Sequence, residues 1–564
     1  MTYAPPTADY EFLYRDAFGR DIVAAATDGA MTAADAAEII AGAGELAAEV
    51  LAPLDRPGDQ IGARLEDGQV RLPAGFAEAY QTFVEAGWVG AVAPESAGGD
   101  ELPSSVQAGL GEIWNGANAA FALCWMLTAG AIHALDAVAG EELRQTYLTK
   151  LVSGEWTGTM NLTEPDAGTD LGAIRTLATP REDGTWSIRG QKIFITWGDH
   201  DVAENIVHLV LARTPDAPEG SRGLSLFVVP KTLVNADGSL GARNGVSTVA
   251  IEHKLGIHAS PTCVLAYEDA TGYLAGELHG GLTAMFVMMN SARVGMGYQA
   301  TGIAERAYQK AAAYAAERLQ GRVLDRPEGT PIAGHPDVAR LLRSMSSQIF
   351  AMRALSVYVG DLFDRGVEDA AALQLAEFFV PILKGWASEE NLRVTSEAIQ
   401  VHGGMGFVEE TGIAQHYRDA RIVPIYEGTT AIQANDLIGR KLLRNGGETA
   451  EVLFAQISET VEALRSAPGE VAARTAERLA RATDAAQRAT AAVLAFGASP
   501  RDAYAASVPY LTLLGVLAGG WMHALAVLAA SGDASRLAAA DFYGAHHLSR
   551  VHALAEAVAA GEIA

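Results

Sequence analysis

From residue 10 to about residue 149, apolar residues recur at spacings of three and four, as residues 32–54 and 75–88 illustrate. This spacing places the apolar side chains on one face of a helix. A link rich in Gly and Pro at residues 92–103 separates two such stretches. The pattern predicts a helical N-terminal domain.

Near residue 155 the pattern changes to short runs rich in β-branched and aromatic residues, divided by Gly, Pro, Asn and Asp turns. Such runs, repeated within about 120 residues, predict a compact antiparallel barrel or sandwich, inserted between helical regions. The runs are residues 185–196, 205–214, 224–231, 246–255 and 262–274.

Long helical patterns return at residue 281 and continue to the Asn-Gly-Gly-Glu sequence at residues 445–448, which predicts a boundary. An Ala-rich helical region follows, without an evident catalytic cluster. The predicted fold class is therefore mainly α with a β insert. The predicted domains are an N-terminal extension and helical domain at residues 1–154, a middle antiparallel β-barrel domain at 155–280, a helical bundle at 281–445 and an additional C-terminal helical domain at 446–564.

Two stretches, residues 116–135 and 507–532, lack Asp, Glu, Lys and Arg over a length that spans a bilayer. Each is diluted by small or polar residues and contains a His. We therefore expect buried bundle helices and no membrane span. The polar N-terminus has no basic segment followed by an apolar one, and does not predict a signal peptide.

Composition narrows the possible partners and the compartment. Acidic residues outnumber basic ones by 68 to 41, a formal charge of -27, which makes nucleic acid a poor partner. Cys124 and Cys263 lie far apart, so the sequence predicts no disulfide framework and fits a reducing cytoplasm. His546, His547 and His552 lack the i,i+4 spacing of metal ligands, so we expect a solvated helix and no metal site.

Three stretches have the residue types of a ligand site, although each also has an ordinary structural interpretation. The polar loop at residues 159–173 suits a polar ring or a phosphate, or is a simple surface loop. Phe194 and Thr196 share one face of a strand, where they suit a flat conjugated ligand or form a hairpin with a core Phe. Two further sets suit a diphosphate or are mere helix ends: Arg318 with Gln320, and Gln400 with the Gly403-Gly404 turn.

A carboxylate, Glu427, stands between the apolar run at residues 421–426 and the apparent first turn of a helix. On its own it is either a helix-start residue or a base at the edge of a dry pocket. The helix terminus favours the anion by about 0.3–1 kcal/mol. Burial opposes this by raising the pKa, and we expect burial to prevail once a substrate fills the pocket.

In chain order, TEPDAGTD, GQKIFIT, IEHKLGIHASPTC, ERLQG, QVHGGMGF and IYEGTTAIQ resemble the motifs of the acyl-CoA dehydrogenase family, over roughly residues 75–443. Thr169 stands where the family has Ser, and Phe194 where it has Trp. Four stretches resemble the long bacterial subgroup, which includes 3-(methylthio)propanoyl-CoA dehydrogenases and broad-range fatty acyl-CoA dehydrogenases. They are the YAPPTADYEFL opening, the EHKLGIHASPTCVLAYEDATGYLAG run, the IYEGTTAIQANDLIGRK helix and the added C-terminal helical region.

The resemblance implies an FAD-dependent oxidoreductase of fatty acid metabolism that forms the 2,3-trans double bond of an acyl-CoA and passes electrons to an electron-transfer flavoprotein. It implies a homo-oligomer, at least a dimer, because the ADP half of each FAD is usually held by the neighbouring subunit. The implied flavin contacts are Met160, Leu162, Thr163, Thr169, Phe194, Thr196 and Thr429. The implied contacts of the ADP half are Arg318, Gln320, Gln400, Gly403 and Gly404.

Glu427 matches the family's catalytic base, which removes the α-proton as a β-hydride leaves. Its backbone N–H is implied to polarise the thioester carbonyl. The substrate-binding residues implied by the resemblance are Asn290, Arg293, Tyr426 and Gly428, with Asn290 in place of the family's Asp.

Several alternatives stay open on sequence alone. One is an acyl-CoA oxidase that uses oxygen, and another is a weakly active, DNA-associated member of the family. The C-terminal region is either structural or a docking surface for a partner or a membrane. Trp125, Met288 and Met289 either line the acyl pocket or belong to the core.

Overall fold

The computed structural model describes residues 3–530 and 532–562, which divide into two compact units. The helical unit comprises Met1–Ala48, Pro103–Ala117 and Arg293–Ala564. The β unit comprises Glu49–Leu102 and Asn118–Ala292. The chain passes between the units inside two long helices, α6 (Ser104–Val138) and α9 (Gly281–Glu317), and α6 has a non-helical residue at Asn118 (φ -158°, ψ 94°).

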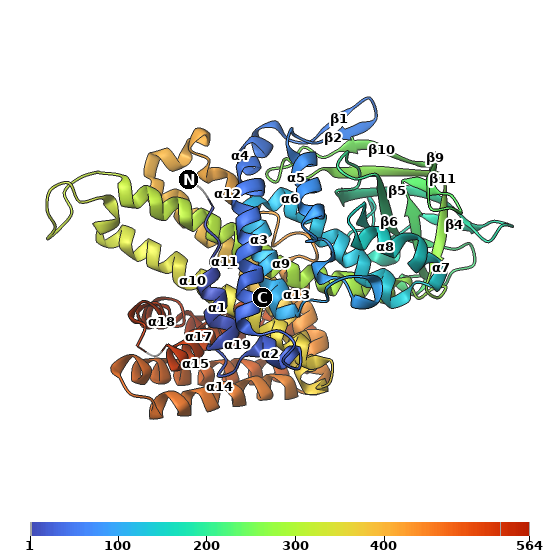
Figure 1. The fold of residues 1–564 in the computed structure, drawn as a ribbon. Coiled ribbons are helices and arrows are strands. Elements are labelled where there is room, and N and C mark those ends of the chain that lie inside the picture. Colours follow the sequence, from blue (N-terminus) through green and yellow to red (C-terminus); the bar gives the residue numbers. More distant parts are fainter. Residues whose placement is uncertain (1–2, 531, 563–564) are drawn as a thin grey trace. The chain divides into compact units, whose positions relative to one another are not determined.

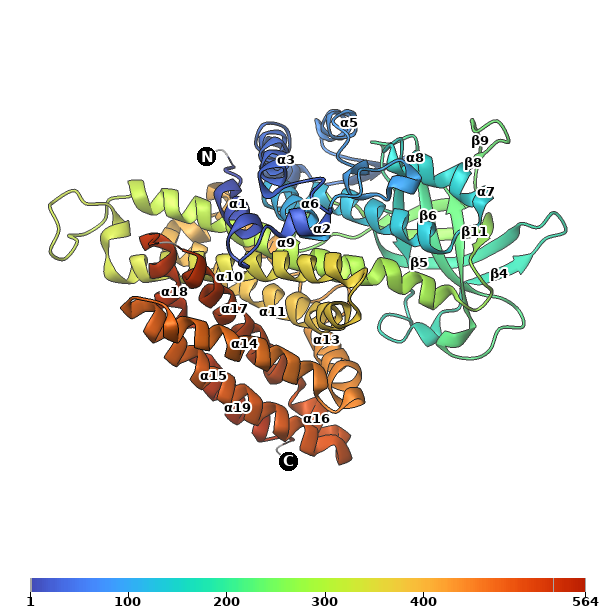
Figure 2. The same ribbon diagram turned by 60° about the horizontal axis from the view of Figure 1, so that its bottom comes forward.

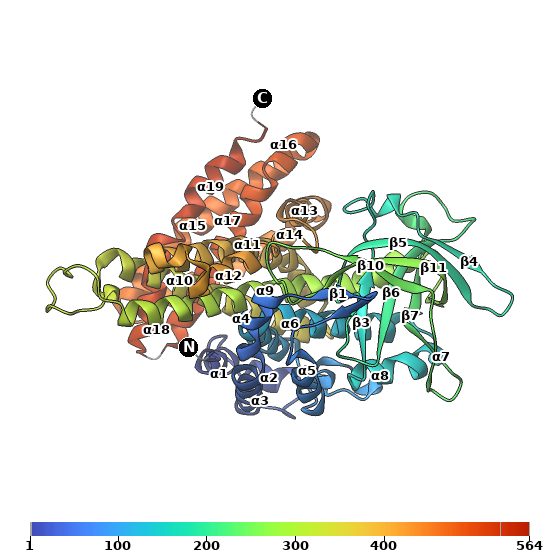
Figure 3. The same cartoon turned by 90° about the horizontal axis from the view of Figure 1, so that it is seen from above.

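The β unit contains a closed barrel, drawn in green in Figures 1 and 3. β11 pairs with β5, β5 with β4, β4 with β6, β6 with β7, and β7 with β11 again. β3 and β10 extend the sheet beside β6 and β11. The strands are β3 (Trp156–Asn161), β4 (Leu177–Pro180), β5 (Trp186–Thr196), β6 (Asn205–Arg213), β7 (Leu224–Pro230), β10 (Val246–Ile251) and β11 (Thr262–Ala275), with a separate hairpin of β8 (Thr232–Val234) and β9 (Leu240–Arg243).

The predicted β-barrel is confirmed, but the expectation of purely antiparallel pairing is wrong. β3 runs parallel to β6 from Trp156 to Asn161, and β4 meets β6 in parallel at Leu177. β6 is buried along both faces, which explains its nearly continuous apolar sequence. Val207 and Leu209 pack between the sheet and helices, whereas Val210 joins the cluster inside the barrel.

Helices and one short hairpin complete the β unit. The hairpin joins β1 (Arg64–Glu66) to β2 (Gln69–Arg71) and is a short β element within the region predicted to be mostly helical. Asp67 (φ 50°) and Gly68 (φ 73°) are both left-handed, as a tight two-residue hairpin turn requires. The helices are α4 (Ala52–Ile61), α5 (Phe76–Glu85), α7 (Glu141–Leu143) and α8 (Thr149–Val152), besides the second part of α6 and the first part of α9.

The helical unit is a bundle to which C-terminal helices are added. Figure 2 shows α10 and α11 side by side, with α14, α15, α17 and α19 packed together, and the helix contacts agree. Besides the first part of α6 and the second part of α9, its helices are α1 (Thr7–Arg15), α2 (Ile22–Ala26), α3 (Ala33–Leu46), α10 (Pro336–Gly366), α11 (Ala370–His402), α12 (Ile413–Ala420), α13 (Thr430–Asp436), α14 (Glu448–Ser466), α15 (Glu470–Ala495), α16 (Pro500–Ala505), α17 (Ser507–Ala529), α18 (Ala534–His546) and α19 (Arg550–Ala559).

Within residues 3–530 and 532–562, two helices are long and apolar enough to cross a membrane by length and composition, α6 and α17. The most apolar windows of α6 and α17 are 72% and 78% buried in the protein. α17 packs against α10, α11, α14, α15, α18 and α19. A helix surrounded by others needs no polar face, which accounts for its composition.

A buried cluster of charges ties α1 to the bundle. Arg353 of α10 contacts Asp9 at 2.6 Å, Glu112 at 2.5 Å and Glu305 at 2.8 Å. Tyr10 donates a hydrogen bond to Glu112 at 2.5 Å. Burial raises the pKa of Glu112, and Arg353 opposes this by favouring its anion.

The C-terminal histidines do not lie on one solvated helix. His546 ends α18, His547 follows it, and His552 lies in α19. The prediction fails most clearly at His547, which is buried with its ring centroid 5.1 Å from that of Tyr543. Cys124 and Cys263 are both free and buried.

Candidate active site

Glu427 lies in a sharp turn of the helical unit that leads into α13. Glu427 (φ 53°) and Gly428 (φ 87°) are consecutive left-handed residues, a conformation that a Glu rarely adopts. Thr429 is the N-cap of α13 and accepts a hydrogen bond from the N–H of Ile432 at 3.3 Å. Thr429 thus caps α13, and Glu427 lies outside the helix.

Side chains from three helices hold this turn. Lys384 of α11 donates to the carbonyl of Gly428 at 2.6 Å. Gln433 of α13 donates to the carbonyl of Glu427 at 2.9 Å. Tyr426 donates to Gln299 of α9, so the residues on both sides of Glu427 are fixed.

The hydroxyl of Thr430 donates to Glu389 of α11 at 2.7 Å, which anchors the start of α13 as well.

Among the hydrogen bonds of the described residues, none is donated by the backbone N–H of Glu427. That N–H is therefore available to a ligand.

Burial raises the pKa of the half-buried Glu427, and the positive charges of Arg293 and Lys384 oppose the rise. The net shift is upward without any substrate. Ile425, in the apolar run before Glu427, is itself 45% exposed. Arg293 has a buried Nε without a hydrogen-bond partner.

A separate set of predicted residues lies in the β unit, where the loop after β3 is pinned to β5. The N–H of Ile193 donates to the carbonyl of Thr163 at 2.9 Å. The ammonium of Lys192 donates to the carbonyl of Leu162 at 2.8 Å and pairs with Glu164 at 2.9 Å. These contacts bring Leu162 and Thr163 to the strand that contains Phe194 and Thr196.

Phe194 projects from an irregularity in β5. Its φ of 58° coincides with a register shift against β11, and its side chain is 58% exposed. The core-Phe interpretation is therefore wrong. Thr196 is half-buried, and Ile195 between Phe194 and Thr196 is buried. Of the remaining residues predicted here, Met160 is half-buried and Thr169 is exposed.

The residues predicted to bind a diphosphate gather at two neighbouring helix ends of the helical unit. α9 ends just before Arg318, and α11 ends at His402. The rings of Tyr314 and His402 stack with centroids 4.4 Å apart, which brings the two ends together. Arg318, Gln320, Gln400, Gly403 and Gly404 are all exposed there.

The Gly403-Gly404 pair is not explained by packing within the chain. A Cβ at either position would meet nothing within 4 Å, and Gly403 has a φ of 59°. Gly403 is thus required by its left-handed backbone, while Gly404 leaves an open approach to the backbone.

Four sequence models match successive parts of the chain. They describe an acyl-CoA dehydrogenase N-terminal domain (residues 34–155), middle domain (159–270) and C-terminal domain (279–443), and an acetyl-CoA dehydrogenase C-terminal-like domain (453–564). The chain belongs to the acyl-CoA dehydrogenase family. It is accordingly an oxidoreductase, and the resemblance found in the motifs is confirmed.

Individual members of the acyl-CoA dehydrogenase family extend this result. The chain is 49% identical over 551 residues to 3-methylmercaptopropionyl-CoA dehydrogenase of Ruegeria pomeroyi, with 96% of this chain and 94% of that protein covered. It is 38% identical over 433 residues to a butyryl-CoA dehydrogenase of Syntrophomonas wolfei, with 73% and 71% covered. The structure of a Bacillus anthracis acyl-CoA dehydrogenase complexed with FAD has a TM-score of 0.76, at 24% identity, with 94% and 89% covered, and shows the shared fold.

For this acyl-CoA dehydrogenase, sequence reasoning missed the residues that position Glu427. Lys384, Gln299 and Gln433 all contact its turn or the neighbouring Tyr426. Of these three, only Lys384 could have been singled out from the sequence, because it is a charged residue within an apolar run. In the structure this run is a fully buried stretch of α11. Of the predicted substrate residues, the structure brings Arg293 into the electrostatic surroundings of Glu427, while Asn290 is exposed on α9.

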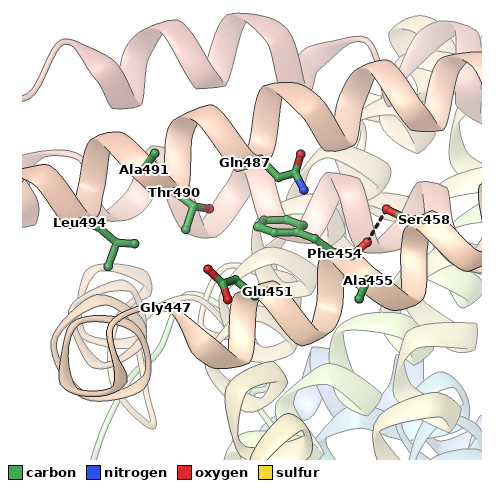
Figure 4. A pocket seen from close by; sticks show the side chains of 9 residues that line it. All are labelled: Gly447, Glu451, Phe454, Ala455, Ser458, Gln487, Thr490, Ala491 and Leu494. Atoms are coloured by element: carbon green, nitrogen blue, oxygen red, sulfur yellow. Dashed lines mark hydrogen bonds between the residues drawn. The ribbon is translucent and has the colours of Figure 1, made fainter.

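A groove between α14 and α15 contains none of the predicted site residues of this acyl-CoA dehydrogenase. Figure 4 shows Phe454 of α14 directed toward Gln487 and Thr490 of α15. The lining residues are Gly447, Glu451, Phe454, Ala455, Ser458, Gln487, Thr490, Ala491 and Leu494.

Met288 belongs to the apolar core of the β unit, with Met289 packed against it.

Proposed function

We propose that the protein oxidises a short-chain acyl-CoA to the 2,3-trans-enoyl-CoA, with FAD as cofactor and Glu427 as catalytic base. The carrying observation is the turn at Glu427, fixed by Lys384 and Gln433, where burial raises the pKa of the carboxylate and the charges of Arg293 and Lys384 oppose the rise. A base with a raised pKa accepts a proton more readily near neutral pH.

In the proposed reaction, Glu427 takes the α-proton while the α-carbon's electron pair forms the double bond and the β-hydrogen leaves as hydride. A bound FAD supplies the acceptor of that hydride. The free N–H of Glu427 donates to the thioester oxygen as negative charge grows there. Arg293 and Lys384 keep Glu427 ionised before the transfer.

The residues present suit FAD. Arg318 and Gln320 offer exposed donors at one helix end, and Gly404 offers open backbone at the other. In the β unit, the exposed ring of Phe194 beside Thr196 suits the edge of a flavin. Leu162 and Thr163 are held next to them by the Lys192 and Ile193 bonds.

A homodimer is proposed for the same site. Exposed apolar side chains cluster beside the Gly403-Gly404 turn, with Phe407 92% exposed, Met405 47% and Val408 38%. A second copy that covers them would bring its FAD to the exposed donors of Arg318 and Gln320. In a monomer, this apolar surface would stay exposed to water.

The proposed substrate is 3-(methylthio)propanoyl-CoA, supported by the 49% identity to the Ruegeria pomeroyi enzyme over nearly the full length. The proposed electron acceptor is an electron-transfer flavoprotein and the proposed location is the cytoplasm. The second candidate for the electron acceptor is oxygen, which would make the protein an acyl-CoA oxidase.

The test is enoyl-CoA formation by purified holoenzyme from 3-(methylthio)propanoyl-CoA, butanoyl-CoA and longer saturated thioesters. We expect dye-linked turnover with the highest kcat/KM for the methylthio or butanoyl thioester. Oxygen consumption at the same rate as dye reduction would make the enzyme an oxidase. A lack of turnover with every thioester would overturn the proposed function.

A further inference from the structure

Lys384 is a buried lysine with a direct bond to the turn of the proposed base. Its side chain lies in the middle of α11 and has no exposed surface. Its ammonium donates to the carbonyl of Gly428 at 2.6 Å. A lysine is rarely buried completely unless its charge is used, because its desolvation is costly.

The charged groups around Lys384 come from three elements. Glu427 in the turn and Glu389 of α11 are the negative groups, and Arg293 of α9 is positive. Burial lowers the pKa of Lys384 to about 8, and Glu427 opposes this decrease. Lys384 is therefore largely protonated at neutral pH, when a carboxylate base has to be ionised.

The bond also acts on the backbone. Glu427 and Gly428 are both left-handed, and such a conformation persists only where its surroundings impose it. Lys384 fixes the carbonyl of Gly428, while Gln433 fixes that of Glu427. Together these bonds determine the direction of the two peptide units that carry the carboxylate and its free N–H.

We propose that Lys384 is a positioning residue of the active site, which orients the Glu427-Gly428 turn through the Gly428 carbonyl and supplies a positive charge that favours ionised Glu427. This inference rests on the proposed function. Lys384 itself does not exchange a proton with the substrate.

The test compares Lys384→Met, which removes the donor and the charge, with Lys384→Gln, which removes the charge and keeps a donor. The control is Lys441→Met, because Lys441 also reaches α11, where it pairs with Glu377 at 2.6 Å away from the turn. We expect the acid limb of the kcat/KM profile to move to higher pH by about one unit in both Lys384 variants. We expect kcat to fall at least about tenfold in Lys384→Met, less in Lys384→Gln, and to stay unchanged in the control.

Profiles of folded, FAD-containing Lys384→Gln and Lys384→Met that overlay the wild-type profile would overturn the charge role. If Lys384→Met does not fold, Lys384→Gln decides the question. A crystal structure of a Lys384 variant tests orientation without activity, and an unmoved Gly428 carbonyl would overturn the positioning role. Wild-type enzyme without turnover on any acyl-CoA contradicts the proposed function instead, so the two failures are distinguishable.

Discussion

Replacing Lys192 by methionine removes the cation that fixes the loop after β3. The Lys192 side chain has no exposed surface, and its partner Glu164 is 8% exposed. Removing one partner of a buried pair costs about 3–5 kcal/mol, because the remaining charge has no compensation. The same change frees the Leu162 carbonyl, which receives the second Lys192 bond at 2.8 Å.

The control uses an ion pair between Arg189, which lies on β5 like Lys192, and Asp269 of β11. Its side chains are 66% and 55% exposed, so Arg189→Met should cost no more than about 1 kcal/mol. Lys192→Met is expected to weaken FAD binding at least tenfold, which corresponds to about 1.4 kcal/mol of the lost free energy. Lys192→Met combined with Glu164→Gln should recover part of the loss, because the uncompensated charge is gone.

The assays are FAD titration of the apoprotein at pH 7 and hydrogen exchange of the Ile193 amide, which bonds to Thr163 in the pinned loop. A loop loosened by about 3 kcal/mol exchanges this amide roughly a hundredfold faster. Equal effects of Lys192→Met and Arg189→Met would refute the reasoning, since burial is the feature that distinguishes the two pairs.

Three further predictions concern the helical unit. Burial lowers the pKa of His523 to about 4 and that of His547 to about 3. At pH 5 the unfolded chain therefore binds a proton at each imidazole that the folded protein does not, and each lowers the free energy of unfolding by about 2 kcal/mol relative to neutral pH. Urea unfolding should show this acid loss reduced in His523→Gln, and an identical pH dependence would contradict it. Arg353→Met should lower the free energy of unfolding by about 3–5 kcal/mol in the same assay, whereas a change under about 1 kcal/mol would show that its buried carboxylates need no cation. Phe407→Asp should shift the protein toward monomer in gel filtration, unlike Val367→Asp, whose side chain is also exposed, at 87%; an unshifted Phe407→Asp dimer would exclude this interface.

The sequence predicted elements wherever the local pattern decides the structure. The transition at residue 155 and the long helices are confirmed, because periods of two and of three to four residues reflect which faces are buried. The β1–β2 hairpin was missed, although its Asp67-Gly68 turn is a local feature, because the flanking strands are short and mostly polar. The parallel β3–β6 pairing could not be predicted, since alternation along a strand does not specify its partner.

The candidate site was predictable only as far as motifs extend. Glu427, Thr429 and the Gly403-Gly404 turn stand in recognisable sequences, and the structure gives each a distinct backbone role. Lys384 is far from Glu427 in the chain, and its bond to Gly428 depends on how α11 packs beside α13. As expected, burial raises the pKa of Glu427, although the positive charges of Arg293 and Lys384 oppose the rise.

The most direct test of the central claim is the formation of enoyl-CoA by Glu427→Gln holoenzyme supplied with 3-(methylthio)propanoyl-CoA and measured by mass spectrometry. Glutamine keeps the size of the side chain and the turn but cannot accept the α-proton. The prediction is that the variant retains its FAD and its affinity for the thioester, while turnover falls at least about a thousandfold. A folded, FAD-containing Glu427→Gln enzyme that forms product at a rate near that of the wild type would contradict the assignment of Glu427 as the base.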